Sequence, residues 1–328
     1  MSAATGGVTL TADVTLDTDQ ANSSSGGAAS FGSAINGTTL GSESLTIDTA
    51  ASALTLPAVG TTTALEALSV TTSGVVTLNA NIETDDNTGT GNIDMSAATG
   101  GVTLAGGGTI TLNSDDGSSG TGGAVDLSGS AVDGTTGGDE ELVVTAGDGA
   151  VTLGAVGTTT DLGALSVTTG GVTTLGGNIT TDDDSGSTGN IDMSAATGGV
   201  TLTTDVTLTS DQGASGSGGT VNLSGSAVDA TGAGAESLTI AAGDGAVTLG
   251  ALGTTTALEA LSVTTAGVTS LGGNIDTDDN IGTGNVDMSA ATGGVTLTGD
   301  VSIDTDDAAS GTGGAASFGS AINGTTLG

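Results

Sequence analysis

The sequence predicts an all-β parallel solenoid, in which the chain winds into stacked coils of short strands. Three observations lead to this fold class: tandem repetition without change, aliphatic residues that alternate with polar ones, and glycine-rich turns at short intervals. Tandem repetition is typical of elongated proteins whose units pack mainly on their neighbours. Alternation at period two, with β-branched enrichment, indicates strands. We expect about 24 residues per coil and about four coils in each repeat of about 95 residues.

The repeat is defined by the decapeptide MSAATGGVTL, which occurs four times, starting at Met1, Met95, Met193 and Met288. It divides the chain into units 1–94, 95–192 and 193–287 and a partial unit 288–328, and we expect them to form one continuous solenoid. The segment 26–41 returns unchanged at 313–328, so the partial unit copies the first. Because Met1 is in phase with the other three methionines, we interpret the sequence as a window of a longer protein.

Similar alternating triplets mark the predicted strands of each unit. In the third unit they stand at 221–223, 238–240 and 261–263, and the triplet 286–288 completes the set. The same strand returns about one coil later, which favours a solenoid over an antiparallel sandwich, whose neighbouring strands would differ. Alternation places one set of side chains on each face. We expect Val102, Leu104, Val200, Leu202, Val295 and Leu297 to be buried, with Thr103, Thr201 and Thr296 facing outward and the methionines and Phe31 and Phe318 in the core.

The composition excludes several function classes. The chain has no Lys, Arg, His or Cys and 37 acidic residues. Nothing can neutralise the phosphates of nucleic acid or an anionic membrane surface, so we expect neither as a partner. Ser–His, Cys–His and Ser–Lys catalytic pairs are impossible, and acidic pairs recur in every unit whereas an active site normally occurs once. We therefore predict that the protein is not an enzyme. No long apolar run suggests a membrane span.

Acidic loops are the candidate binding sites. One series lies at 85–86, 182–184 and 278–279, and a second at 17 and 19, 115–116, 211, and 304 and 306–307. Members of the two series are about one long coil apart, so we expect them to meet at one corner, where stacked carboxylates repel. Ca²⁺, which takes six to eight oxygen ligands, would relieve that repulsion. The candidate Ca²⁺ ligands are Asp85, Asp86, Asp115, Asp116, Asp183, Asp184, Asp211, Asp278, Asp279, Asp306 and Asp307. The alternative interpretation is a set of solvated turns that keep the rod soluble.

Three runs of this chain, 237–253, 260–279 and 284–307, resemble the β-strand repeats of filamentous-haemagglutinin-type giant bacterial adhesins. The likeness lies in the style of the repeat and covers the whole chain. It implies a right-handed parallel β-helix, secretion, and a cell-surface or fibre role. The chain carries no recognisable secretion domain, so the export route is not evident from it.

The sequence therefore predicts a structural protein: the shaft of an extracellular filament, sheath or adhesin stalk, with copies of itself and cations as partners. The alternative is a surface that binds Ca²⁺, mineral or ice through its acidic loops and its Thr-rich segments at 61–63, 158–160 and 254–256. A flat, uninterrupted Thr face would favour this alternative, whereas irregular faces would favour a shaft.

Overall fold

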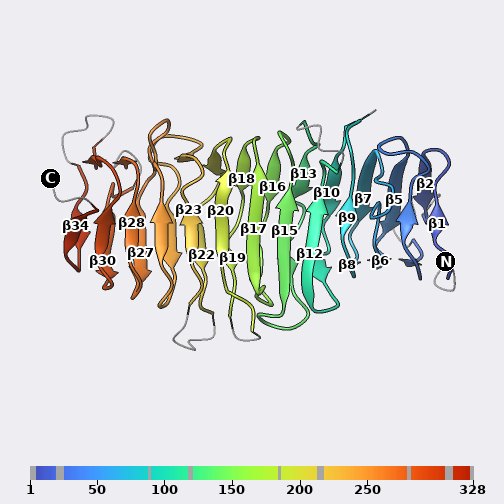
Figure 1. The fold of residues 1–328 in the computed structure, drawn as a ribbon, viewed down its shortest axis with the longest axis horizontal. Coiled ribbons are helices and arrows are strands. Elements are labelled where there is room, and N and C mark those ends of the chain that lie inside the picture. The colour runs from blue at the N-terminus through green and yellow to red at the C-terminus, as the bar shows by residue number, and fades with distance from the viewer. Residues whose placement is uncertain are drawn as a thin grey trace.

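The computed structural model describes residues 5–19, 26–87, 90–116, 121–183, 186–212, 218–278, 282–306 and 313–325. In these ranges the chain forms a parallel β-solenoid without helices, which confirms the predicted fold class. The molecule is a rod, and its strands lie across the long axis (Figure 1). None of the described residues belongs to a helix that is long and apolar enough to cross a membrane.

Three faces run along the rod, and each turn of the chain adds one rung to each face. Single-residue bridges at Val59, Val156 and Leu252 fill the places where a face has no strand. Face I comprises β1 Val8–Thr9, β4 Ile35–Asn36, β9 Ile82–Glu83, β12 Gly108–Asn113, β15 Glu140–Thr145, β17 Ala164–Thr169, β20 Ile191–Ala196, β23 Val221–Leu223, β26 Val247–Leu249, β28 Thr269–Leu271, β31 Val295–Leu297 and β34 Ile322–Gly324. Face II comprises β2 Val14–Asp17, β5 Ser44–Ala50, β7 Ala67–Thr72, β10 Ile93–Ala98, β13 Val125–Leu127, β16 Val151–Leu153, β18 Thr173–Leu175, β21 Val200–Leu202, β24 Val228–Ala230, β29 Ile275–Asp276 and β32 Ile303–Asp304. Face III comprises β3 Ala29–Ser30, β6 Leu54–Leu56, β8 Val76–Leu78, β11 Val102–Leu104, β14 Val132–Asp133, β19 Ile179–Thr180, β22 Val206–Thr209, β25 Leu238–Ala241, β27 Leu261–Thr265, β30 Val286–Ala291 and β33 Ala316–Phe318.

The sequence repeat and the turn do not coincide. From β8 to its counterpart β18 the chain passes ten strands and one bridge, which makes eleven rungs, and the same count separates β18 from β28. At three rungs per turn, one repeat is three and two-thirds turns. A turn takes about 26 residues rather than the expected 24, and the repeat falls one rung short of the expected four turns.

The missing rung lies between the triplets at 221–223 and 238–240. Only 238 − 221 = 17 residues separate them, too few for a turn of about 26. The chain therefore passes two faces instead of three: β23 lies on face I, against β20 and β26, whereas β25 lies on face III, against β22 and β27.

Each repeat is consequently rotated by one face relative to the last. The segment that begins IDMSAA or VDMSAA forms β10 on face II, β20 on face I and β30 on face III. Any feature that the sequence repeats is thus presented on three different sides of the rod.

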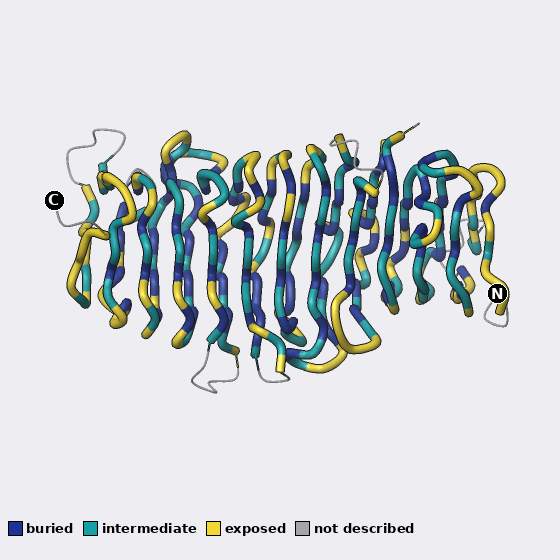
Figure 2. The backbone as a smooth tube through the Cα atoms, in the orientation of Figure 1, coloured by how far each residue is buried: buried dark blue, intermediate teal, exposed yellow. Residues whose placement is uncertain are grey.

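Aliphatic ladders fill the interior, because parallel pairing in register places like residues above one another. Val76, Val102 and Val132 are consecutive partners on face III, and the buried positions form one core along the rod (Figure 2). The predicted burial is confirmed for Val102, Leu104, Val200, Leu202 and Val295.

Leu297 is only half-buried, since it lies near the C-terminal end, and Thr103, Thr201 and Thr296 are half-exposed as expected. Met95, Met193, Met288 and Phe31 are buried, and Phe318 packs at the edge of the core. Met1 lies outside the described residues.

Candidate functional site: the acidic edges

Long connections project from the edges where two faces meet. We call four consecutive connections with their acidic side chains an acidic edge. The first acidic edge joins face I to face II through the segments 37–43, 60–66, 84–92 and 114–124. Its acidic residues are Glu43, Glu66, Asp85, Asp86, Asp115 and Asp116.

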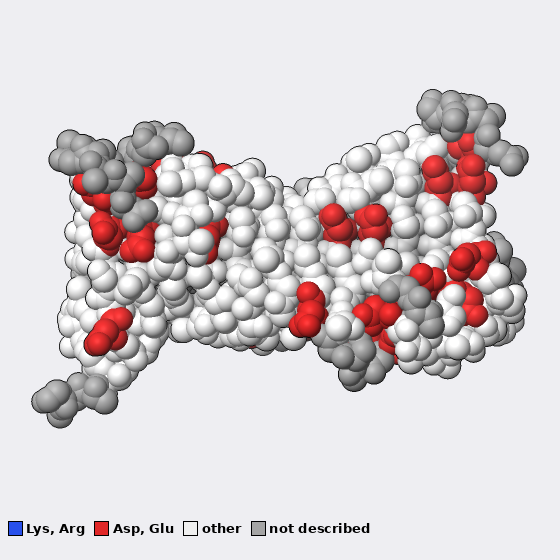
Figure 3. Space-filling model, turned by 90° about the horizontal axis from the view of Figure 1, so that it is seen from above, with Lys and Arg blue, Asp and Glu red and all other residues white. Residues whose placement is uncertain are grey.

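Rotation of the repeat puts the other two acidic edges elsewhere. The second joins face III to face I through segments that begin at 134, 157, 181 and 210, and the third joins face II to face III from 231, 253, 277 and 305. Acidic side chains therefore gather in separate patches on the surface (Figure 3). Each acidic edge spans four turns and the next one continues on another side.

Backbone hydrogen bonds show that the two acidic series of the first edge meet, as the spacing predicts. Thr84 N donates to Asn113 O at 2.8 Å, and Asp116 N donates to Thr84 O at 3.2 Å. In the other two edges, Thr181 N donates to Thr209 O at 2.8 Å and Thr277 N donates to Asp304 O at 2.9 Å. Asp85 and Asp116 thus lie on adjacent turns at one corner.

A hydroxyl closes the base of each acidic loop. Thr84 Oγ1 donates to Gly91 O at 2.5 Å, and Ser114 Oγ donates to Gly123 O at 2.6 Å. The equivalent residues Thr181, Ser210, Thr277 and Thr305 donate in the same way to Gly189, Gly219, Gly284 and Gly314. These hydrogen bonds fix the positions of Thr84 and Ser114, and therefore of the backbone of Asp85 and Asp115, which follow them in the chain.

Asp85 is a buried carboxylate, with 1% of its surface exposed. Its Oδ1 accepts a hydrogen bond from Asn87 N at 2.7 Å. No donor among the described residues reaches Oδ2, which is also buried. Gly41 packs closely against the backbone of Asp85. A Cβ at position 41, where φ is +64°, would stand 2.8 Å from the backbone oxygen of Asp85. Glycine is therefore required for the close approach of the two segments.

The charges around Asp85 are all negative. Burial, followed by the charges of Asp85 and Asp115, raises the pKa of Asp116 above its ordinary value. Burial and the charge of Asp116 likewise raise the pKa of Glu83. Asp116 therefore lies close enough to Glu83, Asp85 and Asp115 for their charges to repel its own, and the chain contains no cationic side chain to compensate them.

A different buried acid opens each acidic edge, and its oxygens are well supplied with donors. Glu140 is 1% exposed and accepts hydrogen bonds from Thr135 N at 3.0 Å, Thr136 N at 3.3 Å and Thr135 Oγ1. Glu43 accepts the same three bonds from Thr38 and Thr39, and Glu236 accepts two from Thr231. The hydrogen bond from the Thr38 hydroxyl is the main reason that the pKa of Glu43 is lowered. We call these three residues the glutamate caps.

The eleven predicted ligands divide into three groups. The structure brings Asp85 and Asp86 together with Asp115 and Asp116. Asp183 and Asp211 belong to the second acidic edge, and Asp278 and Asp306 to the third. Asp184, Asp279 and Asp307 lie outside the described residues. Asp182, which was not among the ligands, is the buried counterpart of Asp85. Within the described ranges no three acidic side chains converge as a ready-made metal site.

Two sets of polar residues were not predicted from the sequence. One is the set of glutamate caps, and the other is a set of Asn residues that accept hydrogen bonds from the backbone of the next turn. Asn81, Asn178 and Asn274 accept hydrogen bonds through Oδ1 from Thr111 N, Thr207 N and Ser302 N, at 3.0, 2.9 and 2.9 Å. The recurrence of Asn at equivalent positions before strands was the available signal.

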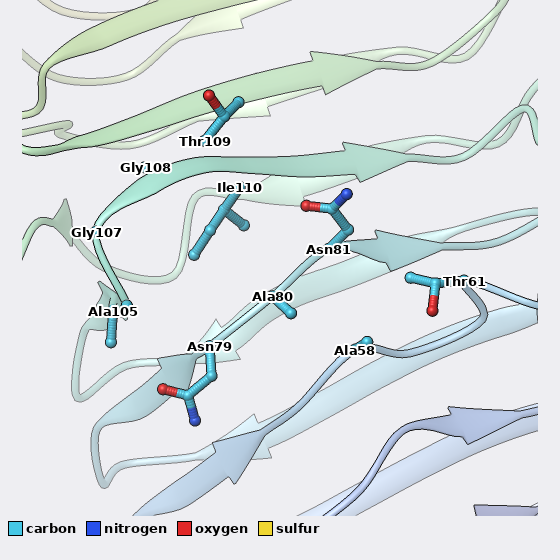
Figure 4. A pocket seen from close by; sticks show the side chains of 11 residues that line it. Ala58, Thr61, Asn79, Ala80, Asn81, Ala105, Gly107, Gly108, Thr109 and Ile110 are labelled. Carbon is cyan, nitrogen blue, oxygen red and sulfur yellow. The ribbon is translucent and has the colours of Figure 1, made fainter. Parts of the chain in front are cut away.

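A shallow hollow of about 270 Å³ lies where a two-residue insertion enlarges one turn (Figure 4). The segment VTLAGGGTITL occupies the place of VTLTTDVTL in the next unit. Gly106, Gly107 and Gly108 all have positive φ, which bends the chain outward. Asn79 and Asn81 line the hollow with small and apolar residues. No titratable group lines the hollow, so its lining supplies no general acid or base.

Comparison of the chain with protein-family models, with curated proteins and with solved structures finds no match. The resemblance to filamentous-haemagglutinin-type adhesins therefore rests on the repeat style and on the solenoid fold, and adhesin membership stays a prediction.

Proposed function

We propose that the protein is a structural, non-enzymatic shaft in an extracellular filament, sheath or adhesin stalk. The observation that carries this proposal is the one-third-turn rotation of the repeat. Each chemically similar feature appears three times on three sides of the rod, so no side is reserved for one reaction or one ligand. A shaft that packs against copies of itself or projects from a surface needs this even presentation, whereas an active site needs one distinct cleft.

Composition supports the same proposal. Without His, Cys, Lys or Arg, the chain has few groups for general acid–base or nucleophilic work. Its net charge of −37 disfavours nucleic acid and anionic membranes as partners. Cations are the partners that such a surface attracts.

The distribution of threonine weighs against an ice-binding surface. The segments 61–63, 158–160 and 254–256 are bends that follow Val59, Val156 and Leu252, and so they lie on three different edges. Their backbone N–H groups are held by Asn36, Asp133 and Asp229. On the strands, Thr55, Thr77 and Thr103 stack on face III, but Asp133 follows them. No flat, uninterrupted Thr face spans the described residues.

Immunogold electron microscopy of cells that produce the chain tests the proposal. An antibody against the 67–83 region should label external filaments or a surface layer along their length. Labelling confined to the cell interior would contradict a shaft. Labelling restricted to filament tips would favour an adhesive or binding role instead.

A further inference from the structure

We infer that the corner where Asp85 and Asp116 meet on adjacent turns is a divalent-cation site, with Ca²⁺ as the best-fitting ion. This inference does not depend on the shaft role. It rests on the burial of Asp85 and on an oxygen of that residue to which no described residue donates a hydrogen bond. Proximity of acidic loops is not the argument. The same acidic edge contains another buried acid, Glu43, and its three hydrogen bonds from Thr38 and Thr39 stabilise its charge without a cation.

Charge balance makes a bound cation the favoured outcome. Burying a carboxylate without a counter-charge or a full set of donors is costly. Asp85 retains one backbone donor, from Asn87, and lies close enough to Asp116 on the adjacent turn for the two charges to repel. No Lys, Arg or His exists anywhere in the chain. The compensating positive charge must therefore come from solution.

The available ligands fit Ca²⁺ better than a transition metal. All are oxygens, because the chain has neither His nor Cys, and hard cations prefer such ligands. Two carboxylates from adjacent turns, completed by backbone carbonyls and water, satisfy Ca²⁺, which tolerates irregular geometry with six to eight ligands. Mg²⁺ demands a near-ideal octahedron and gives up its water reluctantly, so the corner should discriminate between the two ions.

Calorimetric titration of the full chain with CaCl₂ tests the inference, after treatment with EDTA and in about 0.15 M NaCl, where the Debye length is about 8 Å. Asp85→Asn keeps Oδ1 as an acceptor for Asn87 N while it removes the charge. Asp126→Asn is the matched control, because Asp126 faces outward and, among the described residues, accepts hydrogen bonds from Ser128 N and Ser128 Oγ. We expect Asp85→Asn to weaken one Ca²⁺ site roughly tenfold or more, since affinity follows ligand charge, and Asp126→Asn to leave that site unchanged.

Coincident isotherms for Asp85→Asn and Asp126→Asn would overturn the inference, because they would show a diffuse ion atmosphere only. Equal heats with MgCl₂ in place of CaCl₂ would also overturn the assignment of Ca²⁺. Circular dichroism checks that the variants fold. Should Asp85→Asn not fold, Asp116→Asn removes the opposing carboxylate of the same corner, and an unchanged isotherm for that variant would contradict the site equally.

Discussion

The two kinds of buried acid on the acidic edges have the same burial but different surroundings. Glu140 and Asp85 are each 1% exposed. Thr135 and Thr136 supply Glu140 with three hydrogen bonds. Among the described residues Asp85 receives one hydrogen bond, from Asn87, and lies near the charge of Asp116. The difference teaches that burial alone does not identify a site in an acidic solenoid. The number of hydrogen bonds that a buried acid accepts distinguishes an acid that stabilises its own loop from an acid whose charge is left for a cation to balance.

The largest expected effect is the loss of a glutamate cap. Glu140→Ala should lower the free energy of unfolding by about 2–3 kcal/mol, because hydrogen bonds to a charged acceptor are lost and buried donors remain. Urea denaturation measures it. Glu141→Ala is the control, since Glu141 faces outward and accepts one hydrogen bond among the described residues, from Thr109 Oγ1. This variant should change the free energy of unfolding by less than about 0.5 kcal/mol. Equal losses for the two variants would contradict the cap.

A buried oxygen far from the acidic edges extends the comparison to a neutral group. Thr269 is fully buried on face I between Val247 and Val295, and its Oγ1 has no partner among the described residues. The equivalent position in the first unit is Val76. Thr269→Val should raise the free energy of unfolding by about 1–2 kcal/mol, because a buried hydroxyl without a partner is costly.

Because no charge is involved at Thr269, the gain should be the same in EDTA and in Ca²⁺. Thr248→Val on the outward side of β26 is the control and should be nearly neutral. A loss of stability in Thr269→Val would show that the hydroxyl is satisfied after all.

Asp85→Asn should act in the opposite direction to Glu140→Ala when metal is absent. In EDTA we expect a gain of about 1 kcal/mol in the free energy of unfolding, since a like-charge repulsion is removed and the Asn87 bond is kept. In Ca²⁺ the wild-type chain should recover this difference and Asp85→Asn should not. Thermal melting at matched ionic strength measures both, and a loss of stability in EDTA would place Asp85 with the glutamate caps.

The smallest effect concerns acid. The pKa of Glu43 is lowered from 4.5, so its stabilising contribution is present above that pH and is lost as pH falls through the folded-state pKa. The pKa of Asp116 is raised from 3.8, so its contribution declines as pH rises from that value toward the folded-state pKa. In Glu43→Gln the loss of stability below pH 4.5 should be shallower than in wild type. Identical pH profiles of the urea midpoint would count against the lowered pKa.

Sequence reasoning reached the strands and the core because alternation is a local property. Val102 and Leu104 are buried because alternate residues of a strand point to the same face. The two acidic series meet because they are about one coil apart in the sequence. The rotation of the repeat was not predicted, because the bridges at Val59 and Val156 leave no triplet to count and an expectation of four coils per repeat requires a full turn between the triplets at 221–223 and 238–240. The glutamate caps were missed because they depend on hydrogen-bond donors that Thr38, Thr135 and Thr231 supply only in the folded loops.

Hydrogen exchange, followed by mass spectrometry in EDTA and in Ca²⁺ at equal ionic strength, tests the contrast between the two buried acids most directly. The amides of Asp85 and Asp116 donate to Leu65 O and Thr84 O, and those of Thr135 and Thr136 donate to Glu140. We predict that Ca²⁺ slows exchange at Asp85 and Asp116 and leaves Thr135 and Thr136 unchanged. Equal slowing at both places, or none at either, would contradict the account.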